Sequence, residues 1–236
     1  MSPILVLTRP EPEASRFAEA VWTAWGRSCE VIRAPAFRIV PLEVADDLSD
    51  VAHVVLTSAN GVRQLERLAV PAGAVAWCVG DRTAAEAEAM GFETRSARGD
   101  ADALVDLIAG AVPSGRMVHV AGRHTRGAVA ERLTAAGIAC IAVEAYAQEA
   151  LPATSALIGA LHGNRPLVAP VFSPRSAAPL AGLNRTAPLH VIAMSAAVAE
   201  AVEGFHPDTL RIATRPEAAA MQDAVVEVLG RLVDMP

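Results

Sequence analysis

Short apolar runs alternate along this chain with longer alanine-rich stretches. Eight runs have the length and composition of buried strands: 4–7, 53–58, 76–80, 117–122, 139–146, 167–173, 190–194 and 210–214. Nine stretches predict helices after nearly every strand: 11–25, 60–69, 83–90, 100–111, 125–136, 153–162, 175–182, 195–203 and 216–232. This alternation predicts an α/β protein with parallel sheets.

The two halves of the chain resemble each other in four segments that keep their order. The run that begins ILVLTRP matches the one that begins MVHVAGR, and VVLTSANGV matches PVFSPRSAA. VGDRTAAEAEAMG matches IAMSAAVAEAVEG, and SARGDADALVDLIAG matches IATRPEAAAMQDAVVEVLG. Four ordered matches indicate two similar α/β units. The alternative is that any α/β protein rich in alanine and valine looks similar to itself.

Hydroxyl side chains stand where several predicted strands turn into helices. We expect them to cap the helices by accepting a backbone N–H, which stabilises a helix by roughly 1 kcal/mol. In parallel sheets these turns share the carboxyl edge, where such sheets bind ligands. Two facing units would then form a cleft lined by hydroxyl and N–H groups. The candidates are Thr8, Ser58, Thr83, Thr125, Ser173, Ser195 and Thr214.

All twenty basic residues are arginine, because the sequence contains no lysine. Schiff-base, pyridoxal-phosphate and phosphate-loop lysines are therefore excluded. Arginine accompanies many of the same turns, and an arginine fork can bind a carboxylate with two hydrogen bonds. These arginines favour an anionic ligand: Arg9, Arg63, Arg82, Arg123, Arg126, Arg175 and Arg215.

Other classes of function find little support. The six histidines and three cysteines show no metal-ligand spacing, so no metal is expected. The net charge of −6 and the lack of a basic cluster argue against nucleic acid binding. No apolar run is long enough to span a membrane, and the N-terminal residues do not look like a secretory leader. We therefore expect a cytoplasmic protein.

Several motifs together resemble the uroporphyrinogen-III synthase family. They are LTRP, LTSANGV, VGDRTA, VEAY, FSPRSA and AMSAAVAEAV, in this order along the chain. Each motif alone is only a strand, a turn and a helix, so their succession over essentially the whole chain carries the resemblance.

The resemblance implies a fold of two flavodoxin-like parallel α/β domains joined by two extended connecting segments, with a cleft between them. The segments would be APAFRIVPLE (34–43) and VEAYAQEALP (143–152). The first domain would comprise 1–37 plus 149–236, and the second 38–148. The sequence repeats would then not coincide with the domains, because the segment at 117–137 belongs to the second one.

Members of this family cyclise hydroxymethylbilane, a linear tetrapyrrole with eight carboxylates, to uroporphyrinogen III. Water is lost and the last pyrrole ring is inverted through a spiro intermediate, without cofactor or metal. The resemblance implies that Tyr146, the only tyrosine, protonates the leaving hydroxyl. The alternative is that Tyr146 packs between the domains and steadies the hinge.

The resemblance also implies a set of residues that bind the substrate. The matched positions are Thr8, Arg9, Ser58, Asn60, Gly61, Gly80, Thr83, Ser173, Ser176 and Ser195, and the arginine argument adds Arg123 and Arg175. Gly61 would let the backbone approach the ligand or would serve as a plain turn residue. The chain departs from the family at Phe172, where a threonine is common, at Ile192, where a glycine is common, and at Ser195, which replaces a threonine.

The resemblance further implies a monomer, in transient contact at most with the preceding enzyme of the pathway. One rival hypothesis is a non-catalytic cytosolic binder or sensor of a tetrapyrrole or another polycarboxylate. A nucleotide-dependent enzyme is disfavoured, because GRHTRGAV lacks the lysine and the Ser/Thr of a phosphate loop.

Overall fold

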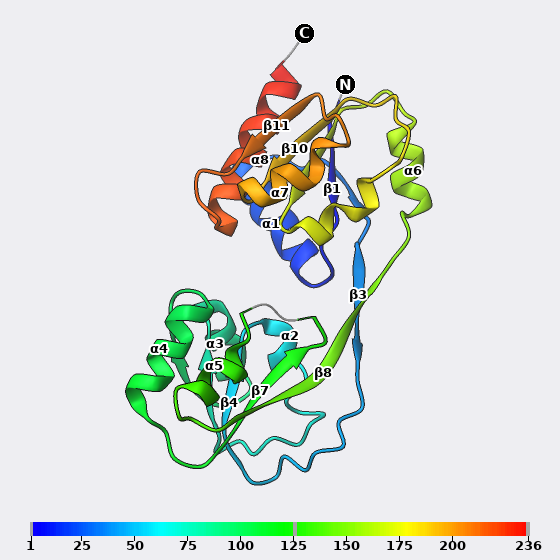
Figure 1. Ribbon diagram of the computed structural model, residues 1–236. Coiled ribbons are helices and arrows are strands. Elements are labelled where there is room, and N and C mark those ends of the chain that lie inside the picture. Colours follow the sequence, from blue (N-terminus) through cyan, green and yellow to red (C-terminus); the bar gives the residue numbers. More distant parts are fainter. Residues whose placement is uncertain (1, 125–126, 235–236) are drawn as a thin grey trace. The chain divides into compact units, whose positions relative to one another are not determined.

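A computed structural model of the chain describes residues 2–124 and 127–234 (Figure 1). The chain forms two units, of which the first contains Met1–Arg38 and Ala150–Pro236 and the second contains Ile39–Glu149. The division expected from the sequence, into domains of 1–37 plus 149–236 and 38–148, stays a prediction.

The first unit is built on a five-stranded sheet in the order β11-β10-β9-β1-β2. The strands are β1 (Ile4–Leu7), β2 (Glu30–Arg33), β9 (Leu167–Val171), β10 (Leu189–Ala193) and β11 (Thr209–Ile212). All neighbouring strands are parallel. Counted along the chain this is the order 2-1-3-4-5 of flavodoxin-like sheets.

Helices cover both faces of this sheet. On one face, α1 (Glu13–Trp25) and α8 (Ala218–Asp234) pack on Leu5, Val168 and Ile192. The other face carries α6 (Ser155–Leu161), the 3₁₀ helix η1 (Pro174–Leu180) and α7 (Ala196–Glu203). Helix α1 buries Ala14, Phe17, Ala18 and Val21, whose spacing gives the helix one apolar face.

The second unit has a six-stranded sheet in the order β3-β8-β7-β4-β5-β6. Its strands are β3 (Phe37–Pro41), β4 (Val51–Leu56), β5 (Val75–Cys78), β6 (Glu93–Ser96), β7 (Arg116–Gly122) and β8 (Cys140–Ala150). Helices α2 (Ala59–Val62) and α3 (Asp81–Glu88) lie over one face. Helices α4 (Ala101–Ala111) and α5 (Val129–Ala135) lie over the other.

The four sequence matches have a structural basis, because matched strands occupy the same place in the two sheets. The pairs β1 and β7, β9 and β4, β10 and β5, and β11 and β6 follow one another in the same spatial order. In the first unit β1 comes first along the chain, before β9, β10 and β11. In the second unit its counterpart β7 comes last, after β4, β5 and β6. The two units are therefore circular permutants of one arrangement.

The two segments through which the chain passes between the units are extended and paired. The Leu42 N–H donates to the Ala145 carbonyl, and the Leu151 N–H donates to the Ala36 carbonyl. Residue numbers rise on one strand as they fall on the other, so β3 and β8 run antiparallel. The expectation of extended connecting segments at 34–43 and 143–152 is met by these two strands.

Several local predictions were wrong. The segment predicted as a helix over 60–69 is helical only at Ala59–Val62 and continues as tight turns, with i→i−3 hydrogen bonds such as Gln64 N–H to Gly61 O. The stretch predicted as a helix over 175–182 is the 3₁₀ helix η1. Strands β2 and β6 were not predicted, because their short sequences EVIR and ETRS are mostly exposed. The predicted start of the helix over 125–136 lies outside the described residues, and α5 itself begins at Val129.

Candidate functional site

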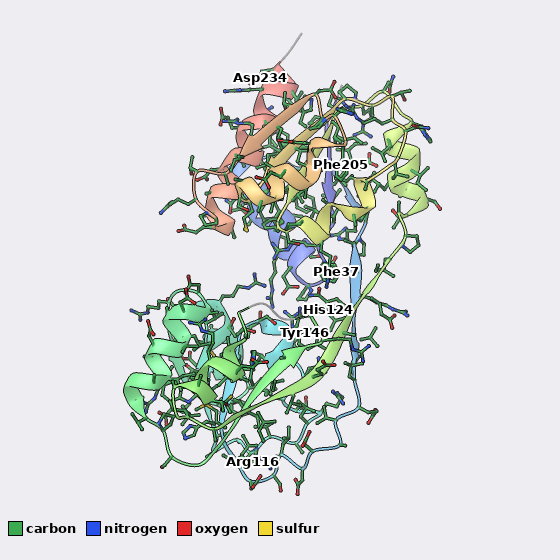
Figure 2. The ribbon with its side chains drawn as sticks, viewed as in Figure 1. Phe37, Arg116, His124, Tyr146, Phe205 and Asp234 are labelled. Carbon is green, nitrogen blue, oxygen red and sulfur yellow. The ribbon has the colours of Figure 1, made fainter. Side chains whose placement is uncertain are left out.

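The predicted site residues of the second unit gather at the carboxyl ends of its strands. Ser58, Asn60 and Gly61 follow β4, and Gly80 and Thr83 follow β5. Arg123 follows β7, and Tyr146 lies on β8 beside the end of β7 (Figure 2). A shared carboxyl edge is where open parallel sheets bind ligands.

A β-bulge sets the position of Tyr146. Ala121 pairs with Glu144 and Gly122 pairs with Tyr146, so Ala145 is an extra residue on β8. The bulge breaks the alternation of the strand, and Ala145 and Tyr146 are both buried although they are consecutive. Bulges of this kind re-aim a side chain at the end of a ladder.

Gly122 gives the tyrosine ring its space. A Cβ at Gly122 would lie 2.6 Å from Cε2 and 2.9 Å from Cζ of Tyr146. The Arg123 N–H also donates to the Tyr146 carbonyl at 2.9 Å. The ring therefore lies against the backbone of β7, and a glycine is required there. Gly122 was not among the predicted site residues; a glycine that ends a strand before an arginine was the available signal.

The phenol of Tyr146 is held by one specific partner. Its hydroxyl shares a hydrogen bond of 2.9 Å with the Ser58 hydroxyl. Burial raises the pKa of the phenol above its ordinary value of 10.0, and the Ser58 hydrogen bond opposes this only in part. Like an ordinary phenol, it carries its proton at neutral pH, and the raised pKa makes it a weaker acid than a free phenol.

Ser58 illustrates a general correction to the predicted helix caps. Ser58 and Ser195 occupy the N-cap positions of α2 and α7, yet neither side chain accepts a cap hydrogen bond within the described part of the chain. Thr83 lies inside α3, whose N-cap is Gly80, and Thr8 precedes Pro12, the N-cap of α1. Thr125 lies outside the described residues, and Thr214 stands before α8, which begins at Ala218.

The side-chain caps that do exist were mostly unexpected. Asp100 accepts hydrogen bonds from the N–H groups of Asp102 and Ala103, and Thr154 accepts one from Leu157. Among the predicted hydroxyls, Ser173 alone is seen to cap a described helix with its side chain. The hydroxyls at 58 and 195 are thus not used by their own helices.

Asn60 and Gly61 are fixed by packing around α2. The Asn60 Oδ1 accepts a hydrogen bond from Arg63, which also forms an ion pair with Glu86 at 3.2 Å. A Cβ at Gly61 would lie 2.8 Å from the Val120 carbonyl oxygen. Gly61 therefore allows α2 to approach β7 closely, a role that was not considered from the sequence, and the two roles expected for it stay predictions.

The candidates of the first unit lie at the carboxyl edge of its own sheet. Thr8 and Arg9 follow β1, Ser173, Arg175 and Ser176 follow β9, and Ser195 follows β10. The Thr8 hydroxyl is buried and makes no hydrogen bond to any described residue. Such a buried donor is costly unless a ligand or water completes it.

Phe172, which stands where a threonine is common in the family, contacts two other side chains. The Arg9 guanidinium lies 4.1 Å from the centroid of the Phe172 ring, and Phe17 packs edge-on against that ring at 5.0 Å. A cation over an aromatic face is attracted by the ring quadrupole. Phe172 thus holds the Arg9 guanidinium at the carboxyl edge, a contact that sequence reasoning did not foresee.

Ser176 has a structural task. Its hydroxyl donates to the Ser173 carbonyl at 2.8 Å and accepts from the Ser173 N–H at 2.9 Å, and the Ser173 hydroxyl accepts from the Ser176 N–H. This reciprocal capping box fixes the start of η1. Arg175 projects from the same turn and is exposed. In the second unit Arg123 is exposed too and pairs with Glu144 at 3.4 Å.

The described residues contain neither a metal-binding cluster nor a membrane-spanning helix. Among residues 2–124 and 127–234, no group of three or more His, Cys, Asp or Glu side chains is placed to hold a metal ion. No helix in the described ranges has the length and apolar character needed to cross a membrane.

The fold and these residues define a protein of two permuted α/β units, each with hydroxyl and arginine groups at the carboxyl edge of a parallel sheet. The chain belongs to the uroporphyrinogen-III synthase family, because the family model described as "Uroporphyrinogen-III synthase HemD" matches residues 23–223. This is a family of lyases.

Solved structures agree with this fold. The chain is similar to the uroporphyrinogen-III synthetase of Helicobacter pylori, with a TM-score of 0.69, 13% identity, and coverage of 97% of this chain and 100% of the other. It is also similar to a mutant uroporphyrinogen III synthase of Thermus thermophilus, with a TM-score of 0.54, 13% identity, and coverage of 98% and 99%. Among curated proteins, no sequence matches the chain significantly.

Proposed function

We propose that this protein is a uroporphyrinogen-III synthase that cyclises hydroxymethylbilane to uroporphyrinogen III without a cofactor. The observation that carries the proposal is the buried phenol of Tyr146, which is hydrogen-bonded to Ser58. It lies at the carboxyl edge of a sheet in a chain of the matching family.

Tyr146 has the role of proton donor in this proposal. Its phenol gives a proton to the terminal hydroxyl of the substrate, the C–O bond breaks, and water leaves. The lone pair of the adjacent pyrrole nitrogen forms the new double bond of the azafulvene. Ser58 keeps the phenol oriented while its proton moves.

The remaining steps follow from the electrophile itself. The substituted carbon of the last ring attacks the azafulvene and gives the spiro intermediate, which fragments and closes again with the ring inverted. Because the substrate supplies its own electrophile, the protein contributes mainly orientation. A proton lost from the ring at the end restores the phenol.

Orientation requires that the eight carboxylates of the substrate be held. Arg9, placed by Phe172, and the exposed Arg123 and Arg175 are suited to bind carboxylates with paired N–H donors. The Thr8 and Ser195 hydroxyls and the N–H group that follows Gly80 supply further donors. Thr83 and Ser176 are buried and pack beneath the surface of these turns.

The protein is further proposed to act as a monomer in the cytoplasm. Cys29, Cys78 and Cys140 are free thiols, which is compatible with a reducing compartment. Contact with the enzyme that makes hydroxymethylbilane would be transient.

An isomer assay tests the proposal. The purified protein is given freshly made hydroxymethylbilane, the products are oxidised, and type I and type III uroporphyrins are separated by chromatography. Excess type III over a protein-free control is the expected result. Type I alone, at the spontaneous rate and with folded protein, would leave a non-catalytic binder of tetrapyrroles or polycarboxylates as the better description.

A further inference from the structure

A cavity lies in the first unit, away from the carboxyl edge of its sheet. It has a volume of about 410 Å³ and is lined by His190, Thr209, Arg211, Val228, Arg231 and Leu232. His190 and Thr209 stand at the beginnings of β10 and β11, and the opposite wall is the last part of α8. The cavity is therefore at the amino edge of the sheet, opposite to the residues proposed for the substrate.

The two arginines that line this cavity are paired with the same glutamate. Glu227 accepts from Arg211 Nη2 at 2.8 Å and from Arg231 Nη2 at 2.5 Å. Two guanidinium groups thus share one carboxylate. Arg231 stands in the last turn of α8, where its charge also offsets the negative end of the helix dipole.

Arg211 retains an unused donor. Its Nη1 is buried and makes no hydrogen bond to any residue in the described ranges. A buried donor without an acceptor is unfavourable, so an acceptor that reaches it stabilises the site. Arg211 is one of the residues that line the cavity, so an oxygen bound there would lie beside this guanidinium group.

The size and the apolar residues of the cavity limit which molecules could bind in it. Val228 and Leu232 form an apolar surface one helical turn apart on α8. A volume of about 410 Å³ is at the small end of the range for small-molecule sites. The space suits one ring or one branched alkyl group together with a carboxylate.

The second unit offers a natural comparison. Arg95 occupies on β6 the place that Arg211 occupies on β11, since Arg95 pairs with Trp77 and Arg211 pairs with Ile192. The Arg95 guanidinium lies 5.0 Å from the centre of the Trp77 ring. Ile192 offers Arg211 no such aromatic face.

We propose that the cavity between β10, β11 and α8 is a binding site for a small organic monocarboxylate. The carboxylate accepts from Arg211 Nη1 and from Arg231, and the apolar body lies on Val228 and Leu232. This site is independent of the proposed reaction, because it uses none of the residues assigned to the substrate.

The test uses benzoate as the probe and benzamide, its uncharged analogue, as the control ligand. Both are titrated into the ¹⁵N-labelled protein, with sodium chloride matched to the benzoate concentration. Benzoate is expected to give saturable shifts of the amides in Thr209–Ile212 and in the last turns of α8. Benzamide is expected to bind at least tenfold more weakly.

Matched variants locate the effect. Arg211→Gln should weaken benzoate binding at least tenfold, and Arg95→Gln, at the equivalent place in the other unit, should leave it unchanged. Circular dichroism and the unfolding temperature of each variant show that the fold is kept, and Arg211→Lys provides a milder change if Arg211→Gln unfolds. Absence of saturable shifts, equal binding of benzamide, or equal losses in both variants would overturn the proposal.

Discussion

The turn after β4 and the turn after β9 have similar sequences but use their serines differently. In the second unit Thr57 and Ser58 send their hydroxyls outward from the turn, to His119 at 3.3 Å and to Tyr146 at 2.9 Å. In the first unit Ser173 bonds with Ser176 in its own helix, and Phe172 precedes it in place of the threonine. The serine of this strand-turn-helix element therefore holds a phenol by a hydrogen bond in one unit and caps its own helix in the other.

The strands beside these turns show the same division. In the second unit β7 ends at Gly122, against which the ring of Tyr146 packs. In the first unit β1 leads into Thr8 and Arg9, and the Arg9 guanidinium lies over Phe172. The proposed mechanism thus assigns the proton donor to the second unit, and assigns cationic and hydroxyl groups of the first unit to substrate binding. The predictions below compare the two units, from the largest expected effect to the smallest, with Ser173→Ala as the matched control for the first of them.

The largest effect is expected from Tyr146→Phe, which removes the hydroxyl and keeps the ring in its place against Gly122. Loss of a general acid should lower kcat about 10²-fold, with type III still the main product because orientation is kept. Single-turnover kinetics with hydroxymethylbilane measures this.

The matched change in the first unit is Ser173→Ala. It should lower the free energy of unfolding by about 1 kcal/mol through the lost cap, and lower kcat far less than Tyr146→Phe does. Equal losses of kcat in the two variants would contradict the division of roles.

Gly122→Ala should disturb Tyr146 from the other side. Because the new Cβ would lie 2.6 Å from the ring, the tyrosine or β7 must move. We expect the free energy of unfolding to fall by about 2 kcal/mol, as in other overpacked cores. Urea unfolding measures the loss. Gly80→Ala is the control, since nothing lies within 4 Å of its added Cβ, and it should cost much less.

His119 should make the second unit sensitive to acid. Burial lowers the pKa of His119 to about 4 from 6.5, so between these values the unfolded chain binds a proton that the folded chain does not. Stability should therefore fall as the pH falls through this window, by roughly 2 kcal/mol between about pH 7 and pH 5.

The measurement is urea unfolding at both pH values. Trp77 fluorescence reports the unfolding, in a protein whose Trp22 and Trp25 are replaced by Phe. His119→Leu introduces the residue that the first unit has at the equivalent place on β1, the buried Leu7, and should remove most of this pH dependence. An unchanged pH dependence in His119→Leu would exclude His119 as its source.

The smallest effect is expected from Phe172→Leu, which removes the ring under Arg9. The guanidinium loses a contact worth about 0.5–1 kcal/mol, so KM should rise about threefold while kcat changes little. Arg9→Leu should raise KM more. Steady-state kinetics separates the two parameters, and a change confined to kcat in Phe172→Leu would rule out its role in positioning Arg9.

Most of the fold could be predicted because the central strands are apolar on both faces. Every residue of ILVL is buried, and so are the first residue and the last three residues of VAHVVL. Such apolar runs are easy to recognise in the sequence. The edge strands β2 and β6 lack this signal because solvent reaches them. The helix predicted over 60–69 failed because apolar spacing cannot distinguish a helix from successive tight turns.

The site was less predictable because its details depend on pairing between distant strands. Tyr146 was found through the resemblance to a family and as the only tyrosine, but its bulge and its seat on Gly122 arise from the register of β7 with β8. The hydroxyls were expected to cap helices. Local sequence does not reveal that Ser58 bonds instead to a residue 88 positions away.

The permuted order of the units has a consequence for synthesis on the ribosome. The second unit is one continuous segment, Ile39–Glu149, and its sheet can form as soon as it has emerged. Strand β1, which is fully apolar, can pair early with β2 on one edge, but its other edge must wait for β9, because Ile4 also pairs with Leu167. At a translation rate of roughly 5–20 residues per second, this wait lasts on the order of ten seconds. During that time β1 and the apolar face of α1 are the natural targets of a chaperone, while the unit encoded directly after them folds first.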